Sequence, residues 1–422
     1  MPMTGSLGMI LVPAASGVGA VLLAVTHQDR PLMAAAGLLV LAASIAVGVA
    51  MLIGSRTGDR RRTREQRERY LDHLEQVRRQ ARDCAIWQRT SAALSHPDPR
   101  EAAGMARLPA RRWERRPGDH DFLVLRAGVG TVPLSRTVVL REDATDPLVT
   151  SDPVCLVAAQ DLAGQYSALP GQPIGLPLTG ATVLSIVGTA DRARGVARAL
   201  LAQLTWSHSP ADVGVLVCSG RLAHWDWVKW LPHSLSDHAR DGPLQARLIT
   251  EDAARAVDLL SAELDRGDVA GPAPPRRMIV VVDRLGERAP PADELSELAV
   301  AARMNGVHQL LLLDDRREEP DRVDIRLSVG GTTAAGPPRP GPPRPGSTVD
   351  HPDTIEMTGP GEDPAARSCR LDELATADAV LLARSFAPLR PGGDGTDRPG
   401  APTDRESAVR PGDVAAIDPA VS

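Results

Sequence analysis

Two long apolar stretches at the start of the chain constrain its fold more than any other feature. Residues 6–26 and 32–53 contain no charged side chain, and each, at about 20 residues, is long enough to cross roughly 30 Å of hydrocarbon as a helix. A short polar turn over residues 27–31 separates them. No charged residue precedes Asp29, so the basic start of a signal peptide is missing. The sequence therefore predicts a transmembrane hairpin over residues 1–55.

The charges that follow the second stretch predict the orientation of this hairpin. Arginines crowd residues 56–69, whereas the turn carries one arginine beside one aspartate. Basic residues favour the cytoplasmic side of a membrane. We therefore expect a protein of the inner (cytoplasmic) membrane, with two spans and with both termini in the cytoplasm.

Composition limits the classes of function that remain. A chain of 422 residues with a net charge of −5 has neither the basic surplus of a nucleic-acid-binding protein nor a strongly acidic tail. The four cysteines, Cys84, Cys155, Cys218 and Cys369, show no paired spacing, so neither a zinc site nor a disulfide framework is expected. Lys229 is the only lysine of the chain, which becomes important for any phosphate site.

Residues 56–100 are predicted to form one long cytoplasmic stalk helix. The segment has no glycine or proline between Gly58 and Pro97 and is rich in arginine, glutamate, glutamine and leucine. Apolar residues recur along it at steps of three and four and form a narrow stripe: Leu71, Leu74, Val77, Ala81 and Cys84. Such a stripe suits either a helix that pairs with a second helix or a solvated linker helix. Pro97 and the residues beside it are expected to stop the stalk.

Residues 101–150 are predicted to form a small β-containing block. The apolar run 122–125 is bounded by charged residues, as in a short strand, and Gly128 and Gly130 follow it at a turn. Residues 138–140 are expected to supply the partner strand.

Residues 151–390 have the alternating pattern of an α/β domain. Short apolar runs at 183–187, 213–218, 278–282 and 309–313 are predicted strands, and residues 192–206, 252–264 and 292–304 are predicted helices. Uniform apolar strands separated by helices indicate a mostly parallel sheet covered on both faces. A proline-rich insert over 336–346 is expected to be an extended spacer, and residues 371–386 a last helix. The tail, residues 391–422, is expected to be disordered. The predicted fold class is thus a membrane-anchored α/β protein with a P-loop-like domain.

The segment after the first strand of this domain is the best candidate for a phosphate site. A strand, a glycine turn at Gly188 and a helix have the geometry in which backbone N–H groups bind phosphate. A P-loop requires G-x-x-x-x-G-K-[ST], but counting from Gly188 places Ala193, Arg194 and Gly195 where that motif has its second glycine, lysine and hydroxyl. Asp191 also repels phosphate at a helix N-terminus. The sequence predicts a nucleotide-binding architecture without hydrolytic parts.

Two interpretations of the acidic strand ends stay open. Asp283 ends one apolar run and Asp314 ends another, so either could belong to a magnesium site or could simply mark a strand that reaches the surface. If Arg194 replaces the lysine, it could bind phosphate as a guanidinium. The weak candidates for cofactor binding are Gly188, Arg194 and Asp283. No catalytic residue and no metal site are predicted, and ATP and magnesium are expected only if this degenerate site binds them.

Two tryptophan-rich motifs resemble a known family. The run 113–119, W-E-R-R-P-G-D, with Asp121, Phe122 and Leu123 after it, resembles a hallmark of EccC, the FtsK/SpoIIIE-type ATPase of type VII (ESX) secretion systems. The run 225–233, W-D-W-V-K-W-L-P-H, is similar to a second one. The spacing of its tryptophans, Trp225, Trp227 and Trp230, predicts that at least one faces outward. By itself, this second run indicates either a packed aromatic corner or a contact surface.

The resemblance implies a function in protein export across the inner membrane. EccC proteins continue into ATPase modules with true Walker motifs, and here residues 413–419 stand where the first would begin, so we expect a split motor or a truncated reading frame. The implied role is a non-catalytic part that anchors and couples the motor. The implied partners are EccB-, EccD- and EccE-like membrane subunits, a downstream ATPase chain if the motor is split, and further copies of the chain. The alternatives are a weak ATP-binding or ATPase domain and a stand-alone membrane adaptor or regulator.

Overall fold

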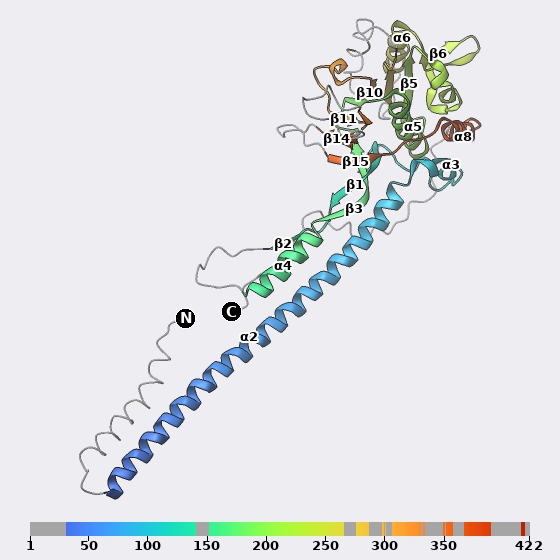
Figure 1. Cartoon of the computed structure of the whole chain (residues 1–422). Helices are drawn as coiled ribbons and strands as arrows, with labels where there is room; N and C mark the ends of the chain where they lie inside the picture. The colour runs from blue at the N-terminus through green and yellow to red at the C-terminus, as the bar shows by residue number, and fades with distance from the viewer. Residues whose placement is uncertain are drawn as a thin grey trace, which may run out of the picture. The chain divides into compact units, whose positions relative to one another are not determined.

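The computed structural model divides the chain into two compact units. It describes residues 31–140, 152–265, 276–286, 298, 300, 306–330, 332–333, 349–350, 352–357, 367–389 and 415–417. Unit 1 comprises residues 1–82, 136–166 and 414–422, and unit 2 comprises residues 83–135 and 167–413. Figure 1 gives the labels of the elements, which are used below.

A single helix, α2 (Pro31–Ser95), contains residues 56–95 of the stalk predicted over 56–100 and also the second apolar stretch. It ends at Ser95, as expected from the proline that follows at position 97. The residues of α2 up to Arg82 belong to unit 1, and the remainder belongs to unit 2.

The predictions of a transmembrane hairpin and of a two-span protein of the inner membrane are wrong. Within the residues that the structure describes, no helix is both long enough and apolar enough to cross a membrane. Residues 32–53 are not a separate element, because they form one end of the 65-residue helix α2, whose other part is rich in charged side chains. The first predicted span, residues 6–26, lies outside the described residues.

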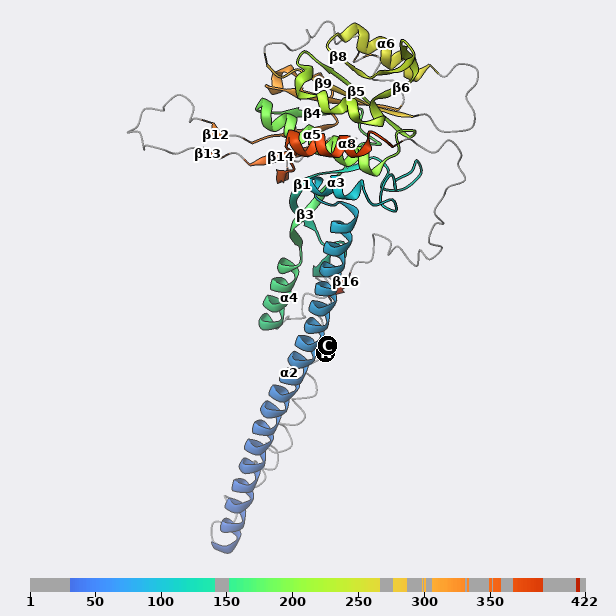
Figure 2. The ribbon, with the colours of Figure 1, turned by 90° about the vertical axis from the view of Figure 1, so that its right-hand side faces the viewer.

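In unit 1 the stalk pairs with a second helix, α4 (Pro153–Gln165). Both views of the molecule show α4 alongside α2 (Figures 1 and 2). Among the described residues of unit 1, the buried ones on α2 are Tyr70, Leu74, Val77 and Ala81, and those on α4 are Cys155, Ala159 and Leu162. Arg67 donates hydrogen bonds to Asp152, which caps the N-terminus of α4, at 2.7 and 2.9 Å. Of the two interpretations of the apolar stripe, helix pairing is therefore the correct one for this part of α2.

The strand expected at 138–140 exists but has another partner. β2 (Val138–Leu140) pairs in parallel with β16 (Ala415–Ile417) in unit 1. It does not pair with β1 (Val124–Pro133), so that prediction was wrong, because local apolar pattern defines a strand but not its neighbour. The three residues of β16 also correct the expectation of disorder over 391–422 at this one point.

Unit 2 is built on one large mixed sheet. In the described part of the chain its strand order is β3-β1-β15-β14-β11-β4-β10-β9-β5-β8. The strands from β11 to β8 are parallel to one another, whereas every pairing from β11 through β14, β15 and β1 to β3 is antiparallel. The bounds of these strands beyond β1 are as follows: β3 Ala168–Pro177, β4 Val183–Val187, β5 Val213–Ser219, β8 Ile249–Thr250, β9 Arg277–Asp283, β10 Val307–Leu313, β11 Ile325–Ser328, β14 Asp353–Met357 and β15 Arg367–Leu371.

Alternate residues of the parallel strands point into two different hydrophobic cores. Ile279 and Val281 of β9 belong to the core that also contains helix α5 (Ala190–Ser207), whereas Met278, Val280 and Val282 belong to the core of helix α6 (Ala253–Leu264). This alternation follows from the two-residue period of a strand. It confirms the predicted sheet with a helix on each face.

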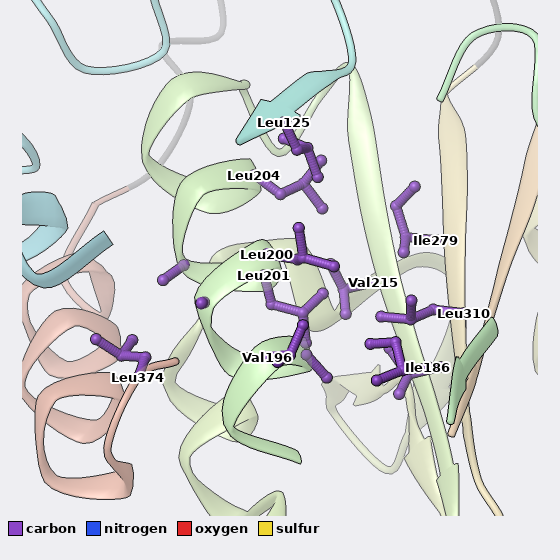
Figure 3. Packing of buried hydrophobic residues seen from close by; sticks show 14 of the residues in the cluster. Leu125, Ile186, Val196, Leu200, Leu201, Leu204, Val215, Ile279, Leu310 and Leu374 are labelled. Carbon is purple, nitrogen blue, oxygen red and sulfur yellow. The ribbon is translucent and has the colours of Figure 1, made fainter. Parts of the chain in front are cut away.

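Helix α5 lies at the centre of unit 2. Apart from Arg198, every residue from Ala193 to Ser207 is buried. Figure 3 shows Val196, Leu200 and Leu204 of α5 facing strand residues such as Val215 and Leu310. Both views place helix α8 (Thr376–Phe386) beside α5 (Figures 1 and 2).

The remaining elements are short. The predicted helix 371–386 begins only at α8, because Leu371 ends strand β15. Most of the predicted helix 292–304 and the insert 336–346 lie outside the described residues. The short helices and outer strands are η1 Pro99–Glu101, α3 Ala102–Met105, η2 Leu222–His224, η3 Asp226–Trp230, η4 Pro232–Ser234, β6 Leu235–Asp241, β7 Leu244–Arg247, η6 Arg316–Glu318, β12 Thr332–Thr333 and β13 Val349–Asp350.

Candidate functional site

The three candidate residues lie at the carboxyl ends of parallel strands in unit 2. Gly188 follows β4, Asp283 ends β9, and β10 runs between these two strands. Arg194 is on α5, the helix that follows β4. In open α/β sheets, the crevice at these strand ends is the usual place for a ligand.

Gly188 is required by a close approach of two backbone segments. Its φ is +153°, and its N–H donates to the carbonyl of Leu313 at the end of β10 at 3.0 Å. A Cβ at this position would stand 2.7 Å from Cβ of Val329 and 3.0 Å from its carbonyl oxygen. The glycine therefore serves the packing of β4 against the segment after β11, and no phosphate is needed to explain it.

Helix α5 begins too early for a phosphate-binding loop. It starts at Ala190, four positions before Arg194, and the N–H of Ala193 already bonds to the carbonyl of Thr189. In a P-loop these positions form a loop whose free N–H groups surround the phosphates. Here the segment is wound into the first turn of a helix and carries the negative charge of Asp191.

Arg194 and Asp283 form a buried ion pair. Nε of Arg194 donates to Oδ2 of Asp283 at 2.9 Å, and Nη2 donates to Oδ1 at 3.3 Å. The side chains are 6% and 1% exposed, so both charges are nearly fully removed from water. Nη2 also donates to the carbonyl of Leu285 at 3.1 Å. The guanidinium is thus occupied by protein groups, as a buried charge must be.

Three further donors complete the surroundings of Asp283. Trp225 Nε1 donates to Oδ2 at 2.8 Å, Ser219 Oγ donates to the same atom at 3.2 Å, and the N–H of Leu285 donates to Oδ1 at 3.1 Å. We call these groups, with Arg194, the Asp283 cluster. Both carboxylate oxygens accept more than one hydrogen bond, so a magnesium ion would have to displace protein donors.

Sequence reasoning found part of this cluster and missed the rest. It selected Arg194 and Asp283 separately, and the structure brings them together. Ser219 was missed, although it ends β5 in register with Asp283 on the neighbouring strand β9. The pattern of a polar residue after each parallel strand could have identified it. Asp314, the other acidic strand end, instead accepts from the N–H of Gly286 at 2.9 Å.

A second arrangement of charged groups surrounds the C-terminus of α2. Three guanidiniums donate to its last carbonyls and to the next residue: Arg111 to Leu94 at 2.7 Å, Arg115 to Ser95 at 2.5 Å and Arg126 to His96 at 3.1 Å. We call them the arginine cap. Cations at this end satisfy carbonyls without a helical partner and oppose the negative end of the helix dipole.

The arginine cap is fixed by the rest of unit 2. Arg126 pairs with Asp372 at 2.6 Å, and its backbone N–H donates to Gln203 of α5 at 2.9 Å. Arg115 is 4% exposed and pairs with Asp121 at 3.3 Å. Burial lowers the pKa of Arg115, and the charge of Asp121 opposes that effect.

The segment that supplies Arg115 also terminates α5. The backbone N–H groups of Trp113 and Arg115 donate to the carbonyls of Trp206 and Ser207 at 2.8 and 3.0 Å. The indole N–H of Trp113 donates to Thr205 at 3.2 Å. Residues 113–115 therefore connect the last turn of α2 to the last turn of α5.

Two buried histidines lie behind this junction. His208 Nε2 accepts from the N–H of Leu123 at 3.0 Å, so its ring is neutral with the proton on Nδ1. His233 Nε2 bonds to the carbonyl of His208 at 2.9 Å. Burial lowers the pKa of His208 to about 4 and that of His233 to about 3.

Comparison with known proteins finds relatives named as EccC proteins of ESX secretion systems. The chain is 28% identical over 393 residues to the ESX secretion system protein EccC of Thermomonospora curvata. The aligned region covers 90% of this chain and 27% of that protein. It is 36% identical over 225 residues to the ESX-3 secretion system protein EccC3 of Mycobacterium tuberculosis, covering 52% of this chain and 16% of the relative. The chain is EccC-like. No family model matches it.

The EccC-like chain thus spans about a quarter or less of the length of these two relatives. It is also similar to the solved cytoplasmic domain of the type VII secretion ATPase EccC of Thermomonospora curvata, with 18% identity and a TM-score of 0.40 over 67% of this chain and 33% of that one. The two motifs that resemble EccC proteins contribute to the two arrangements described above. Residues 113–115 connect α2 and α5, and Trp225 is part of the Asp283 cluster.

Proposed function

We propose that the EccC-like chain is a coupling component of a type VII secretion motor, and that its α/β unit does not hydrolyse ATP. The observation that carries the coupling role is the arginine cap. A helix end held by three guanidiniums, each of them also ion-paired within unit 2, cannot rotate or fray without breaking charge-assisted hydrogen bonds. Displacement of α5 is therefore passed to the end of α2.

The lack of hydrolysis is supported by the Asp283 cluster. The residue at the place of the P-loop lysine is Arg194, and it is bound to the acidic residue that would otherwise face magnesium. Phosphoryl transfer depends on a cation and donors that are free to meet the phosphates. Here the cation and the carboxylate neutralise each other in the protein interior.

The proposed partners follow from the relatives. They are EccB-, EccD- and EccE-like subunits of an ESX system, further copies of the chain, and modules that carry Walker motifs and supply the energy. In this proposal the chain's own contribution is mechanical, because the arginine cap and residues 113–115 link the end of α2 to the end of α5.

The coupling role is tested by removing the arginine cap in the bacterium that encodes the chain. The double variant R115M/R126M is expected to abolish export of the system's secreted proteins while the chain is still produced. Arg107→Ala, an exposed arginine near the same segment, is the matched control and is expected to leave export unchanged. Hydrogen exchange of the amides of residues 90–95 is expected to speed up in the double variant alone. Normal export with a released helix end would overturn the proposal.

The absence of hydrolysis is tested on the purified chain. Calorimetry with Mg-ATP is expected to show no binding, and phosphate release is expected to stay at the level of the buffer. Magnesium-dependent turnover that disappears in Asp283→Asn would contradict this part of the proposal and favour the weak ATPase.

A further inference from the structure

The segment 225–234 buries two of its three tryptophans and exposes the third. Trp225 and Trp227 are 0% and 1% exposed, whereas Trp230 is 39% exposed. This confirms the prediction that at least one of the three faces outward. A large aromatic side chain left in water on an otherwise well-packed segment marks a candidate contact surface.

The position of Trp230 is fixed by a frame of short helical turns. The backbone N–H of Val228 donates to the carbonyl of Trp225 at 2.9 Å, and that of Leu231 donates to the carbonyl of Val228 at 3.0 Å. Ser234 Oγ donates to the carbonyls of Val228 and Leu231 at 2.8 and 2.9 Å. The indole N–H of Trp225 donates a hydrogen bond to Asp283, so the Asp283 cluster fixes the first residue of the segment 225–234. A preformed aromatic anchor loses little entropy on binding.

Helix α8 places a cation next to this ring and carries an exposed apolar side chain one turn earlier. Cζ of Arg384 lies 5.8 Å from the centroid of Trp230. Leu381, one turn earlier on the same face of α8, is 52% exposed. We call Trp230, Leu381 and Arg384 the Trp230 surface.

The charge of this surface is not neutralised. Lys229 is 5.7 Å from the ring centroid, but its Nζ pairs with Asp226 at 2.6 Å. Among the residues that the structure describes, no carboxylate lies within ion-pair distance of Arg384. Within the described structure, the guanidinium of Arg384 therefore has no carboxylate partner and can pair with an anionic group of another molecule.

We propose that the Trp230 surface binds an acidic protein segment that also carries a large apolar side chain. The carboxylate pairs with Arg384, and the apolar side chain covers Trp230 and Leu381. Arginine and tryptophan are the side chains that contribute most binding energy at protein interfaces. The carboxylate of Asp226 is already paired with Lys229, so Arg384 is the cation of this surface that is left for a partner. A second copy placed on the same surface would bring two Arg384 side chains together.

Three synthetic helical peptides test the proposal with the full chain. The first peptide carries glutamates and, along one face, leucines. In the second peptide each glutamate is replaced by lysine, and in the third each leucine is replaced by serine. Fluorescence anisotropy is expected to show binding of the first peptide at least tenfold tighter than that of the other two. The variants W230A and R384E are each expected to weaken it about tenfold or more. R384E is expected to gain affinity for the lysine peptide.

Leu244→Ser is the matched control, because Leu244 of β7 is 71% exposed and lies outside the Trp230 surface. It is expected to leave binding unchanged, and melting temperatures of all variants are expected to match the parent chain. Equal binding of the glutamate and lysine peptides, no binding at all, or no effect of W230A and R384E would overturn the proposal. Sedimentation that shows self-association abolished by W230A would overturn it too, in favour of a second copy as the occupant.

Discussion

Arg194 and Asp283, 89 residues apart in the chain, form a buried two-point ion pair between helix α5 and the end of strand β9. A lysine at this place in a P-loop meets phosphate, and the acidic strand end faces magnesium. In the EccC-like chain the two groups satisfy each other instead. The same carboxylate holds Trp225, so the pair also fixes the segment that exposes Trp230.

Removing one partner of this pair is expected to destabilise unit 2 strongly. Arg194→Met leaves a buried carboxylate without its cation and is expected to lower the free energy of unfolding by about 3–5 kcal/mol. The double variant R194M/D283L removes both charges and is expected to be less destabilised than Arg194→Met. Chemical denaturation followed by tryptophan fluorescence measures the free energy of unfolding of both variants and of the single variant Asp283→Leu. A double variant as unstable as the sum of two single losses would argue against a coupled pair.

The buried histidines are expected to make stability fall in acid. In the unfolded chain, His208 and His233 titrate near pH 6.5, whereas burial lowers their folded pKa values to about 4 and about 3. Between these values the unfolded state binds protons that the folded state excludes. The stabilisation that the two histidines contribute is thus expected to be fully present above pH 6.5. The free energy of unfolding is expected to decline by roughly 1–3 kcal/mol per histidine as the pH falls toward 4.

Urea denaturation at a series of pH values measures this decline. His208→Gln keeps an acceptor for the N–H of Leu123 and is expected to make the decline shallower. His238→Gln, at an exposed position on β6, is expected to leave the slope unchanged. An identical slope for His208→Gln and the parent chain would contradict the assignment.

Gly188→Ala is expected to destabilise unit 2 by about 1–3 kcal/mol. The new Cβ would stand 2.7 Å from Cβ of Val329, and the φ of +153° is strained for any residue with a side chain. Gly180→Ala serves as the comparison, because no heavy atom lies within 4 Å of a Cβ built there. Thermal unfolding of the two variants is expected to separate them clearly, and equal melting temperatures would refute the close-approach explanation.

The pairing of α2 with α4 is expected to depend on the buried side of the apolar stripe. Leu74→Ala, at a position 3% exposed, is expected to cost about 2–5 kcal/mol within unit 1. Leu71→Ala, at a position 38% exposed, is expected to change stability by less than about 1 kcal/mol. Hydrogen exchange of the α4 amides reports the difference. Equal protection of α4 in both variants would mean that the stripe does not hold the two helices together.

The sequence by itself determined the elements whose signal is local. The strands predicted at 183–187, 213–218, 278–282 and 309–313 exist, three of them one or two residues longer at an end, and they follow from short apolar runs. The end of α2 at Ser95 follows from a proline. The missing P-loop lysine is equally a local fact. The apolar stretch 32–53 shows the limit of such patterns, because in the described structure it is one end of a longer helix that continues into charged sequence.

Only the tertiary structure decided which distant groups meet. Apolar periodicity does not specify a neighbour, so β2 pairs with β16 and β1 pairs with β3 and β15. A charged residue does not specify its partner either, so the bond of Arg194 to Asp283 and the binding of three arginines to the end of α2 could not be predicted. These contacts exist because the packing of the sheet brings buried charges within hydrogen-bond distance, where each must find a partner or remain unsolvated.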